Sequence, residues 1–222
     1  MNEAEQRLEI CRVGKSLYDR GYVHATAGNI SVRLAQKDGG GFLITPTDAC
    51  LGFLDAERIA RVDEDGVQQS GDRASKTLAL HRRIYGADDT ASCVIHTHSS
   101  HLVRLTLAGV WSAEDILPPI TPYYVMKVGH VPLIPYHRPG DPKVGELVAK
   151  KIATAKSQGR PIRAVMLDRL GPNVWHESLS AAMATLEELE ETARLWLSAS
   201  PRPASLDEDQ IEELRQQFNV NW

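Results

Sequence analysis

The sequence has few cysteines and lacks any long apolar run. Cys11, Cys50 and Cys93 are the only cysteines among 222 residues. Three cysteines at such wide spacing exclude a full disulfide framework and a CxxC metal knuckle, so we expect buried, reduced thiols. A membrane span needs about 18 consecutive apolar residues, and the first residues lack the apolar core of a signal peptide. We therefore expect a cytoplasmic protein with no membrane partner.

An excess of charge of either sign is also missing. The formal net charge is −4 and the pI is about 6.1, with lysines and arginines scattered along the chain. No basic run could follow a phosphate backbone, which argues against nucleic acid as a partner. The length and the 42% apolar content suit one globular domain over residues 1–222. A final helix is predicted at about 205–218, after the proline-rich linker SPRPAS.

Apolar periodicity predicts the main elements. Helices are expected at about 3–20, 75–85, 143–156, 179–197 and 205–218, the last with a capping box over Ser205–Glu208. Strands are expected at 29–34, 41–45, 67–70, 91–95 and 164–167, and the turn KDGGG joins the first two as a hairpin. Several connections are hairpin-short, which favours a mixed sheet covered by helices over a doubly wound parallel sheet.

Two histidines, His96 and His98, stand at the end of the predicted strand 91–95. Residues two apart on a strand point to the same side and can bind one metal ion. Neutral imidazoles suit zinc, manganese, iron or cobalt. The alternative is a pair of hydrogen-bonded polar groups at a strand end, and the triplet HTH alone does not separate the two interpretations.

Three other segments carry groups that suit a phosphate. In TAGNISVR, residues 26–33, a glycine lets the backbone approach an anion closely, and Asn29 supplies a neutral donor. Ser75 and Lys76 stand at a predicted helix start, where free N–H groups, a hydroxyl and an ammonium favour a phosphate. LITPTD, residues 43–48, is the third segment. Each of them alone is more often structural than functional.

Taken together, these motifs occur in an order and spacing that resembles the class II aldolase and adducin family, over roughly residues 5–215. The stretch ILPPITPYYVMKVGHVPLIPYHRPGDP, with SK and EELEETARL, is similar to the subgroup that decarboxylates 3-oxo-tetronate 4-phosphate. The resemblance implies an α/β fold of three layers, in which helices flank a central mixed, largely antiparallel sheet. It also implies a homotetramer with the site between subunits.

The resemblance further implies which residues form the site. His96 and His98 match two of three histidines that bind a divalent metal ion, zinc in the first place and manganese as the alternative. Lys76 would add a positive charge beside the substrate phosphate, and Tyr124, or its neighbour Tyr123, would supply a catalytic tyrosine. The positions that match the phosphate-binding residues are Gly28, Asn29, Thr47, Asp48 and Ser75.

Two positions depart from the family pattern. Thr77 stands where the family has an acid/base glutamate, four residues before the helix histidine His81, and a hydroxyl cannot take up a proton near neutral pH. Leu170 stands where the family has its third metal histidine, which leaves two protein ligands instead of three. Asp168 is a candidate replacement if the late strand continues that far, since it would then share a face with Leu170. The remaining candidate ligands are His101, His130, His137 and His176.

These features favour a metal-dependent decarboxylase. A metal ion at the histidine pair would act as a Lewis acid on the enediolate left when carbon dioxide departs, with Tyr123, Tyr124 or water as proton donor. Aldol cleavage of a fuculose-phosphate type of substrate would suffer more from Thr77, and an epimerase would need a second acid/base group. A non-catalytic module like the adducin head is the alternative that Thr77 and Leu170 would suit.

Overall fold

The computed structural model describes residues 1–220 and 222 of the chain. Its centre is an eight-stranded sheet with the strand order β4-β3-β2-β1-β5-β8-β7-β6. The strands are β1 Asn29–Arg33, β2 Phe42–Ile44, β3 Ala60–Val62, β4 Gln68–Ser70, β5 Cys93–His96, β6 Leu133–Ile134, β7 Ala164–Leu167 and β8 Gly171–His176. Every neighbouring pair is antiparallel except β6 and β7. The predicted mixed, largely antiparallel sheet is confirmed.

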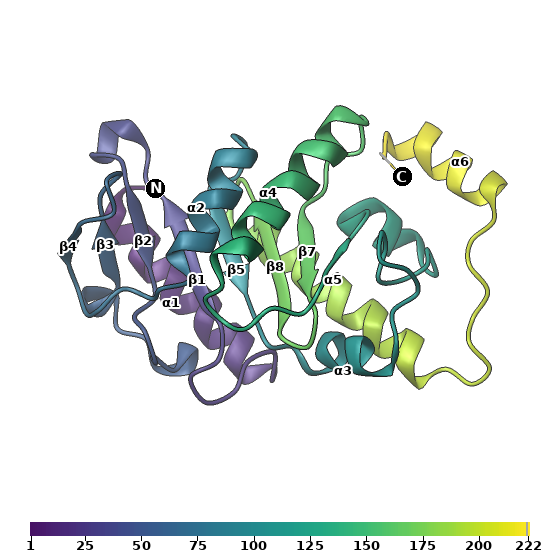
Figure 1. Ribbon diagram of the computed structural model, residues 1–222, viewed down its shortest axis with the longest axis horizontal. Coiled ribbons are helices and arrows are strands. Elements are labelled where there is room, and N and C mark those ends of the chain that lie inside the picture. Colours follow the sequence, from purple (N-terminus) through teal and green to yellow (C-terminus); the bar gives the residue numbers. More distant parts are fainter. Residues whose placement is uncertain (221) are drawn as a thin grey trace.

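Helices cover both faces of this sheet (Figure 1). They are α1 Glu3–Asp19, α2 Leu78–Ala87, α3 Ser100–Ala108, α4 Pro142–Ser157, α5 Leu179–Ser198 and α6 Glu208–Phe218, with a π-helix at Tyr124–Val128 and short 3-10 turns at Gln36–Asp38, Leu51–Phe53 and Ala56–Arg58. Helices α2 and α4 pack on one face, and α1, α3 and α5 pack on the other. In the described part of the chain, no helix is both long and apolar enough to cross a membrane.

Strand β5 divides its side chains between the two layers. Ile95 belongs to the apolar cluster under α1, α3 and α5, whereas Val94 belongs to the cluster under α2 and α4. Because side chains alternate along a strand, His96 points to the same side as Val94. The histidine at the end of the strand therefore lies on the α2 and α4 face of the sheet.

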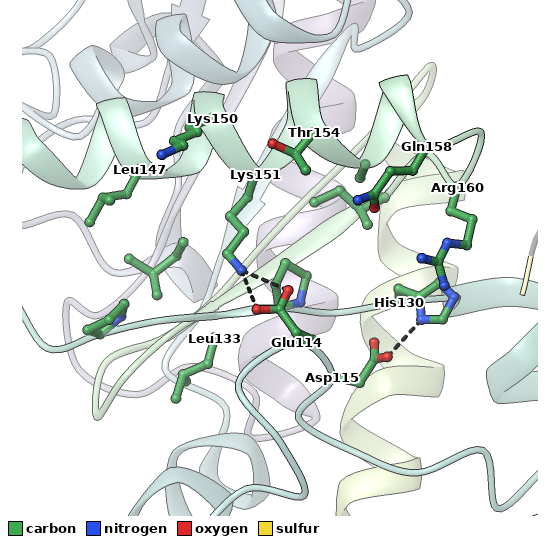
Figure 2. A pocket seen from close by; sticks show the side chains of 15 residues that line it. Glu114, Asp115, His130, Leu133, Leu147, Lys150, Lys151, Thr154, Gln158 and Arg160 are labelled. Carbon is green, nitrogen blue, oxygen red and sulfur yellow. Dashed lines mark hydrogen bonds and ion pairs between the residues drawn. The ribbon is translucent and has the colours of Figure 1, made fainter.

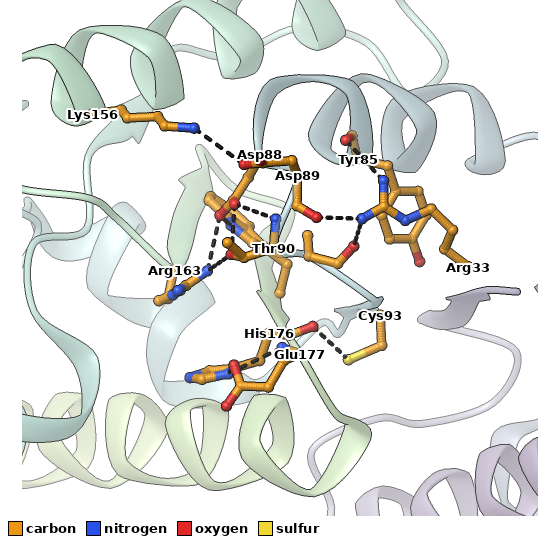
Figure 3. A network of polar contacts seen from close by, with 12 residues as sticks. Arg33, Tyr85, Asp88, Asp89, Thr90, Cys93, Lys156, Arg163, His176 and Glu177 are labelled. Atoms are coloured by element: carbon orange, nitrogen blue, oxygen red, sulfur yellow. Dashed lines mark hydrogen bonds and ion pairs between the residues drawn. The ribbon is translucent and has the colours of Figure 1, made fainter. Parts of the chain in front are cut away.

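A buried carboxylate fastens the C-terminal end of α2 to the sheet (Figure 3). Asp88 accepts hydrogen bonds from the indole of Trp175 on β8, at 3.0 Å, and from Arg163, at 2.9 Å. Burial on its own would raise the pKa of Asp88, but hydrogen bonds from Thr90 and Trp175 outweigh it and lower the pKa. The carboxylate stays ionised, so α2 is fixed at this end and its N-terminal end is held over β1.

Two local expectations are wrong in their boundaries. Helix α6 begins at Glu208, and its capping box joins Asp207 and Gln210 instead of Ser205 and Glu208, because the Asp207 carboxylate accepts the Gln210 N–H at 2.9 Å. The late strand does not continue past Leu167. Residues 168–170 form the turn of the β7–β8 hairpin, in which Arg169 has a φ of 62°. The premise that placed Asp168 and Leu170 on one strand face therefore fails.

Candidate functional site

Six strands begin or end at the same end of the sheet, the end at which His96 lies. Asn29, the first residue of β1, pairs directly with His96, the last residue of β5. Gly171 opens β8 beside the end of β7, and β2 continues past this end into the segment 45–48. The parallel neighbour β6 also ends here, since Ile134 pairs with Leu167. Loops that are far apart in the sequence are thus gathered at one place.

A cavity of about 610 Å³ opens at this end of the sheet, between the sheet and helices α2 and α4. The predicted metal and phosphate residues all line it: Gly28, Asn29, Thr47, Asp48, Ser75, Lys76, His96 and His98. The two substituted positions, Thr77 and Leu170, line it as well, as does Asp168. The structure therefore brings together the four motifs, while the role of each side chain stays a prediction.

His96 is held as a neutral imidazole. Its Nδ1 lies 2.8 Å from the backbone oxygen of Pro172. A carbonyl oxygen only accepts, so Nδ1 carries the proton and Nε2 keeps a lone pair. Burial, together with the nearby charge of His98, lowers the pKa of His96 to about 4. The His98 ring is half-buried, with its centroid 5.1 Å from that of His96, and its pKa is lowered by burial and by His24.

Two glycines let the backbone close around the histidine pair. Gly28 has a φ of +83°, and a Cβ added there would lie 2.8 Å from the backbone oxygen of His96. Gly171 has a φ of +140°, and its added Cβ would lie 1.9 Å from the backbone oxygen of Thr97. Side chains at either position would push the strand end that carries His96 and His98 out of place.

Residues 75–77 were predicted as the start of a helix, but they form a turn that precedes α2. The helix begins at Leu78 with Thr77 as its N-cap, so the helix predicted from Ser75 starts three residues late. The Ser75 hydroxyl accepts the backbone N–H of Thr77 at 3.3 Å, and the Asn29 amide donates to the Thr77 hydroxyl at 3.3 Å. These contacts tie the two phosphate motifs to each other across the cavity wall.

The side chains present do not complete a metal centre with three protein ligands. Among residues 1–220 and 222, no three His, Cys, Asp or Glu side chains come close enough together to hold an ion. Leu170 lies in the hairpin turn and packs against the apolar cluster under α2 and α4. Asp168 lies 3.9 Å from the Arg169 guanidinium. Within residues 1–220 and 222, the imidazoles of His96 and His98 line the cavity, and they belong to no group of three side chains that could hold an ion.

The other candidate histidines have partners of their own. His101 lies 2.8 Å from Glu190, and His130 lies 2.8 Å from Asp115. His176 follows strand β8 away from the cavity, next to Glu177. His137 does line the cavity, but it lies 3.2 Å from the carboxylate of Asp141. None of the four replaces the missing ligand in this arrangement.

The structure does not bring Tyr124 into the cavity. Tyr124 is fully buried in the apolar core, its hydroxyl has no hydrogen-bond partner among the described residues, and burial raises its pKa well above the ordinary value. The π-helix Tyr124–Val128 turns the side chain inward, against Trp222. Tyr123 is 61% exposed and does not line the cavity either. Neither tyrosine therefore lines the cavity of its own chain, and the catalytic role expected of Tyr124 stays a prediction.

Polar groups lie around His96 beneath the cavity, and sequence reasoning did not group them there, although it named Asn29 and His81 for other reasons. The Ser31 hydroxyl lies 2.8 Å from Nδ1 of His81 and 2.7 Å from the hydroxyl of Tyr85. Asn173, which pairs with His96 across β8, is fully buried. Its amide atoms, Nε2 of His81 and Oδ1 of Asn29 have no partner within the described chain. Only the sheet register places these residues around His96, so the sequence held no signal for them.

Sequence reasoning also missed two arginines in a basic part of the cavity lining, although it named His137 as a candidate ligand. There the cavity is lined by Arg83 from α2 and by His137 and Arg138 from the segment that precedes α4. The available signal was a pair of basic residues in the run YHRPGDP, between prolines that keep the chain extended.

A second cavity, also of about 610 Å³, lies between α4 and the segment around His130 (Figure 2). Its charged residues are largely paired: Lys151 donates to Glu114 at 2.9 Å, and His130 lies 2.8 Å from Asp115. No residue of the four predicted motifs lines it. The cavity at the sheet edge is therefore the candidate site.

Comparisons with known proteins point to one family. The family described as class II aldolase and adducin N-terminal domain matches residues 8–197. A 3-oxo-tetronate 4-phosphate decarboxylase of Cupriavidus necator is 55% identical over 99% of this chain and 99% of its own length. The protein of the same description from Escherichia coli K12 is 38% identical, over 96% of each chain.

Solved structures agree with these sequence relatives. The crystal structure of YgbL from Escherichia coli, an aldolase/epimerase/decarboxylase by its description, has a TM-score of 0.86 at 37% identity and covers 96% of this chain and 99% of its own. An L-fuculose 1-phosphate aldolase has a TM-score of 0.75 at 22% identity, over 96% of this chain and 95% of its own, which is a likeness of fold.

Proposed function

Because this chain belongs to the class II aldolase and adducin family, and its relatives described as decarboxylases and aldolases are carbon–carbon lyases, we propose that it decarboxylates a phosphorylated 3-oxo sugar acid of the 3-oxo-tetronate 4-phosphate type. One observation supports this most: four motifs from separate parts of the chain line a single cavity next to His96 and His98. The full-length similarity to decarboxylases narrows the choice within the family.

The reaction in this proposal is the loss of carbon dioxide from a β-keto acid. The C1–C2 bond breaks, C1 leaves as carbon dioxide, and its electron pair moves through C2 into the C3 ketone to give an enediolate. A proton then adds at C2. From 3-oxo-tetronate 4-phosphate the products are carbon dioxide and dihydroxyacetone phosphate. The step needs positive charge at the developing enediolate oxygen more than it needs a base.

The residues of the cavity would divide this work. The turn at Ser75, the backbone at Gly28 and the Asn29 amide bind the phosphate, since backbone N–H groups and hydroxyls suit its oxygens. Lys76 supplies positive charge beside it and favours the enediolate over the ketone. His96, kept neutral and with a lone pair on Nε2, orients the reacting end of the substrate.

Whether this site binds a divalent metal ion can be tested directly. Class II aldolases are typically dependent on a divalent metal ion, and zinc is the ion predicted here. The residues present supply two imidazoles, so no step of the reaction is assigned to an ion. We expect Leu170→His to add the third imidazole from the hairpin turn and to raise the zinc content of the purified protein from substoichiometric to about one ion per chain. Equal, stoichiometric zinc in both proteins would contradict this expectation.

A threonine at position 77 favours decarboxylation over aldol cleavage. Aldol cleavage requires a group that removes a hydroxyl proton from the substrate, and the Thr77 hydroxyl is hydrogen-bonded to Asn29 and Ser75. Decarboxylation requires only a later proton donor, which water can be because the cavity is open to solvent. The chain is therefore better suited to the decarboxylation than to cleavage of fuculose 1-phosphate.

The function is tested by incubating the protein with 3-oxo-tetronate 4-phosphate and measuring carbon dioxide and dihydroxyacetone phosphate together. We expect equal amounts of both products, and no cleavage of fuculose 1-phosphate in a parallel assay. Absence of product from the unaltered chain and from Leu170→His, with zinc or manganese added, would favour the non-catalytic module. The homotetramer belongs to the same proposal, and light scattering of the purified protein tests it.

A further inference from the structure

Part of the cavity lining carries positive charge. Arg83 and Arg138 line the cavity there, and neither guanidinium has an ion-pair partner within 4.0 Å in the described chain. The acid closest in sequence is Asp141, whose carboxylate is already occupied: it accepts the Lys143 N–H at 3.0 Å and lies 3.2 Å from His137. The N–H groups of both guanidiniums can therefore donate hydrogen bonds to an anion in the cavity.

The order of the strands sets the order of the groups along the cavity. From Thr47, in the segment after β2, and Asn29 on β1, the cavity runs to His96 on β5, then to the β7–β8 turn with Leu170, and then to β6. Neighbouring strands lie about 4.8 Å apart, so the histidine pair is one strand away from the phosphate motifs. A short molecule anchored by its phosphate would extend past His96 toward the β6 side.

The segment after β6 returns toward the histidines. Figure 1 shows the green-teal segment before α4 running along the lower edge of the sheet, across β7 and β8, to the start of α4 beside α2. Helix α4 begins at Pro142 with Asp141 as its N-cap, and Gly145 packs on the stem of Arg83. Arg138 lies three residues before that N-cap, on the returning part of the segment, in a wall that also contains Ile134 and Leu170.

The substrate of the proposed function has two anionic ends. Its phosphate is at C4 and its carboxylate is at C1, on the other side of the C3 ketone. With the phosphate at Asn29 and the ketone beside His96, the carboxylate points to the wall that carries Arg138. A planar guanidinium matches a carboxylate with two parallel hydrogen bonds, which a lysine could not provide.

We propose that Arg138 recognises the C1 carboxylate of the substrate and so makes this cavity selective for sugar-acid phosphates over sugar phosphates that lack the acid. The assignment rests on the proposed function, because it takes its substrate from there. Arg138 is a specificity residue: it binds the group that departs as neutral carbon dioxide. Its contact weakens as the C1–C2 bond breaks, and the residue contributes to KM more than to kcat.

The test compares two ligands that differ in the carboxylate. 4-Phosphoerythronate has the carbon skeleton and both anions of the substrate but cannot lose carbon dioxide, and dihydroxyacetone phosphate keeps the phosphate alone. We expect the unaltered protein to bind 4-phosphoerythronate more tightly in calorimetric titrations. Arg138→Gln should weaken that binding by about tenfold, the effect of one charge-assisted contact in a site open to solvent, and should leave dihydroxyacetone phosphate within about twofold.

Two matched variants sharpen the test. Arg83→Gln removes the other guanidinium of the same wall, and Arg104→Gln removes an exposed arginine of α3 outside the cavity; both should keep the preference for 4-phosphoerythronate. Arg138→Lys should recover only part of it, because the ammonium lacks the two-pronged geometry. In turnover of 3-oxo-tetronate 4-phosphate, Arg138→Gln should raise KM without lowering kcat, because the lost contact is weaker in the transition state than in the ground state.

The outcomes distinguish a failure of the assignment to Arg138 from a failure of the proposed function. A preference for 4-phosphoerythronate that persists in Arg138→Gln, or that is lost in Arg83→Gln instead, overturns the assignment to Arg138 and leaves the proposed function standing. Failure of the unaltered protein to bind either ligand overturns the proposed function and the assignment with it. Loss of affinity for both ligands in Arg138→Gln would show a general electrostatic role and overturn the claim of carboxylate selectivity.

Discussion

The imidazole of His81 should make the fold sensitive to acid. His81 is fully buried under the sheet edge, and burial, with a contribution from the charge of His96, lowers its pKa from 6.5 to about 3. Below pH 6.5 the unfolded chain binds a proton at this side chain and the folded chain does not. The contribution of neutral His81 to stability is therefore complete above pH 6.5 and is lost as the pH falls from 6.5 toward 3.

The size of this effect follows from the width of that window. Each pH unit below 6.5 removes about 1.4 kcal/mol from the free energy of unfolding. At pH 5 the loss from this one group is about 2 kcal/mol. Other groups also titrate in this range, so the quantity to measure is the difference between the unaltered protein and His81→Asn.

The assay is urea unfolding at pH 7, 6 and 5, followed by tryptophan fluorescence. We expect His81→Asn to be less stable at pH 7, because the imidazole packs under the sheet edge, but to lose about 2 kcal/mol less between pH 7 and pH 5. Ser31→Ala is the control: it removes the hydrogen-bond partner of His81 and keeps the imidazole, so its pH dependence should persist. Parallel stability curves for the unaltered protein and His81→Asn would refute the reasoning.

Three further predictions test other parts of the site and fold. Gly171→Ala should lower the unfolding free energy by roughly 3 kcal/mol and separate β8 from the Thr97 backbone, measured as a fall in Tm with loss of ligand binding. Lys76→Met should raise KM for the phosphorylated substrate about tenfold and also lower kcat, at unchanged Tm, measured by turnover and calorimetry. Asp88→Asn should destabilise by about 1–3 kcal/mol, because it leaves the Arg163 guanidinium without its carboxylate, and a urea titration at pH 7 measures that loss.

The sequence predicted the parts of the fold that depend on local pattern. The strand that ends at His96, the hairpin of β1 and β2 and the long helices follow from apolar periodicity and from turn residues, which act within a few positions. The motifs at Gly28, Ser75 and Lys76 carried enough sequence information to be grouped in advance, and the structure places them around one cavity.

Features that depend on long-range pairing were not accessible in the same way. Strand β8 could not be predicted from local pattern, because its residues GPNVWH begin with a glycine and a proline and lack a clear alternation. Asn173 is beside His96 only through the pairing of β5 with β8. Tyr124 was placed at the site by resemblance, whereas the π-helix around it directs the side chain into the core.

The hydrogen bond from His96 to the backbone oxygen of Pro172 has a consequence for evolution and for engineering. The group that orients the imidazole is a peptide carbonyl, which every amino acid supplies, so replacement of side chains along the β7–β8 hairpin leaves it in place. The hairpin can therefore exchange a metal-binding side chain for Leu170, or the reverse, while the imidazole keeps its orientation. This tolerance makes position 170 the natural place to install or remove metal chemistry in this scaffold.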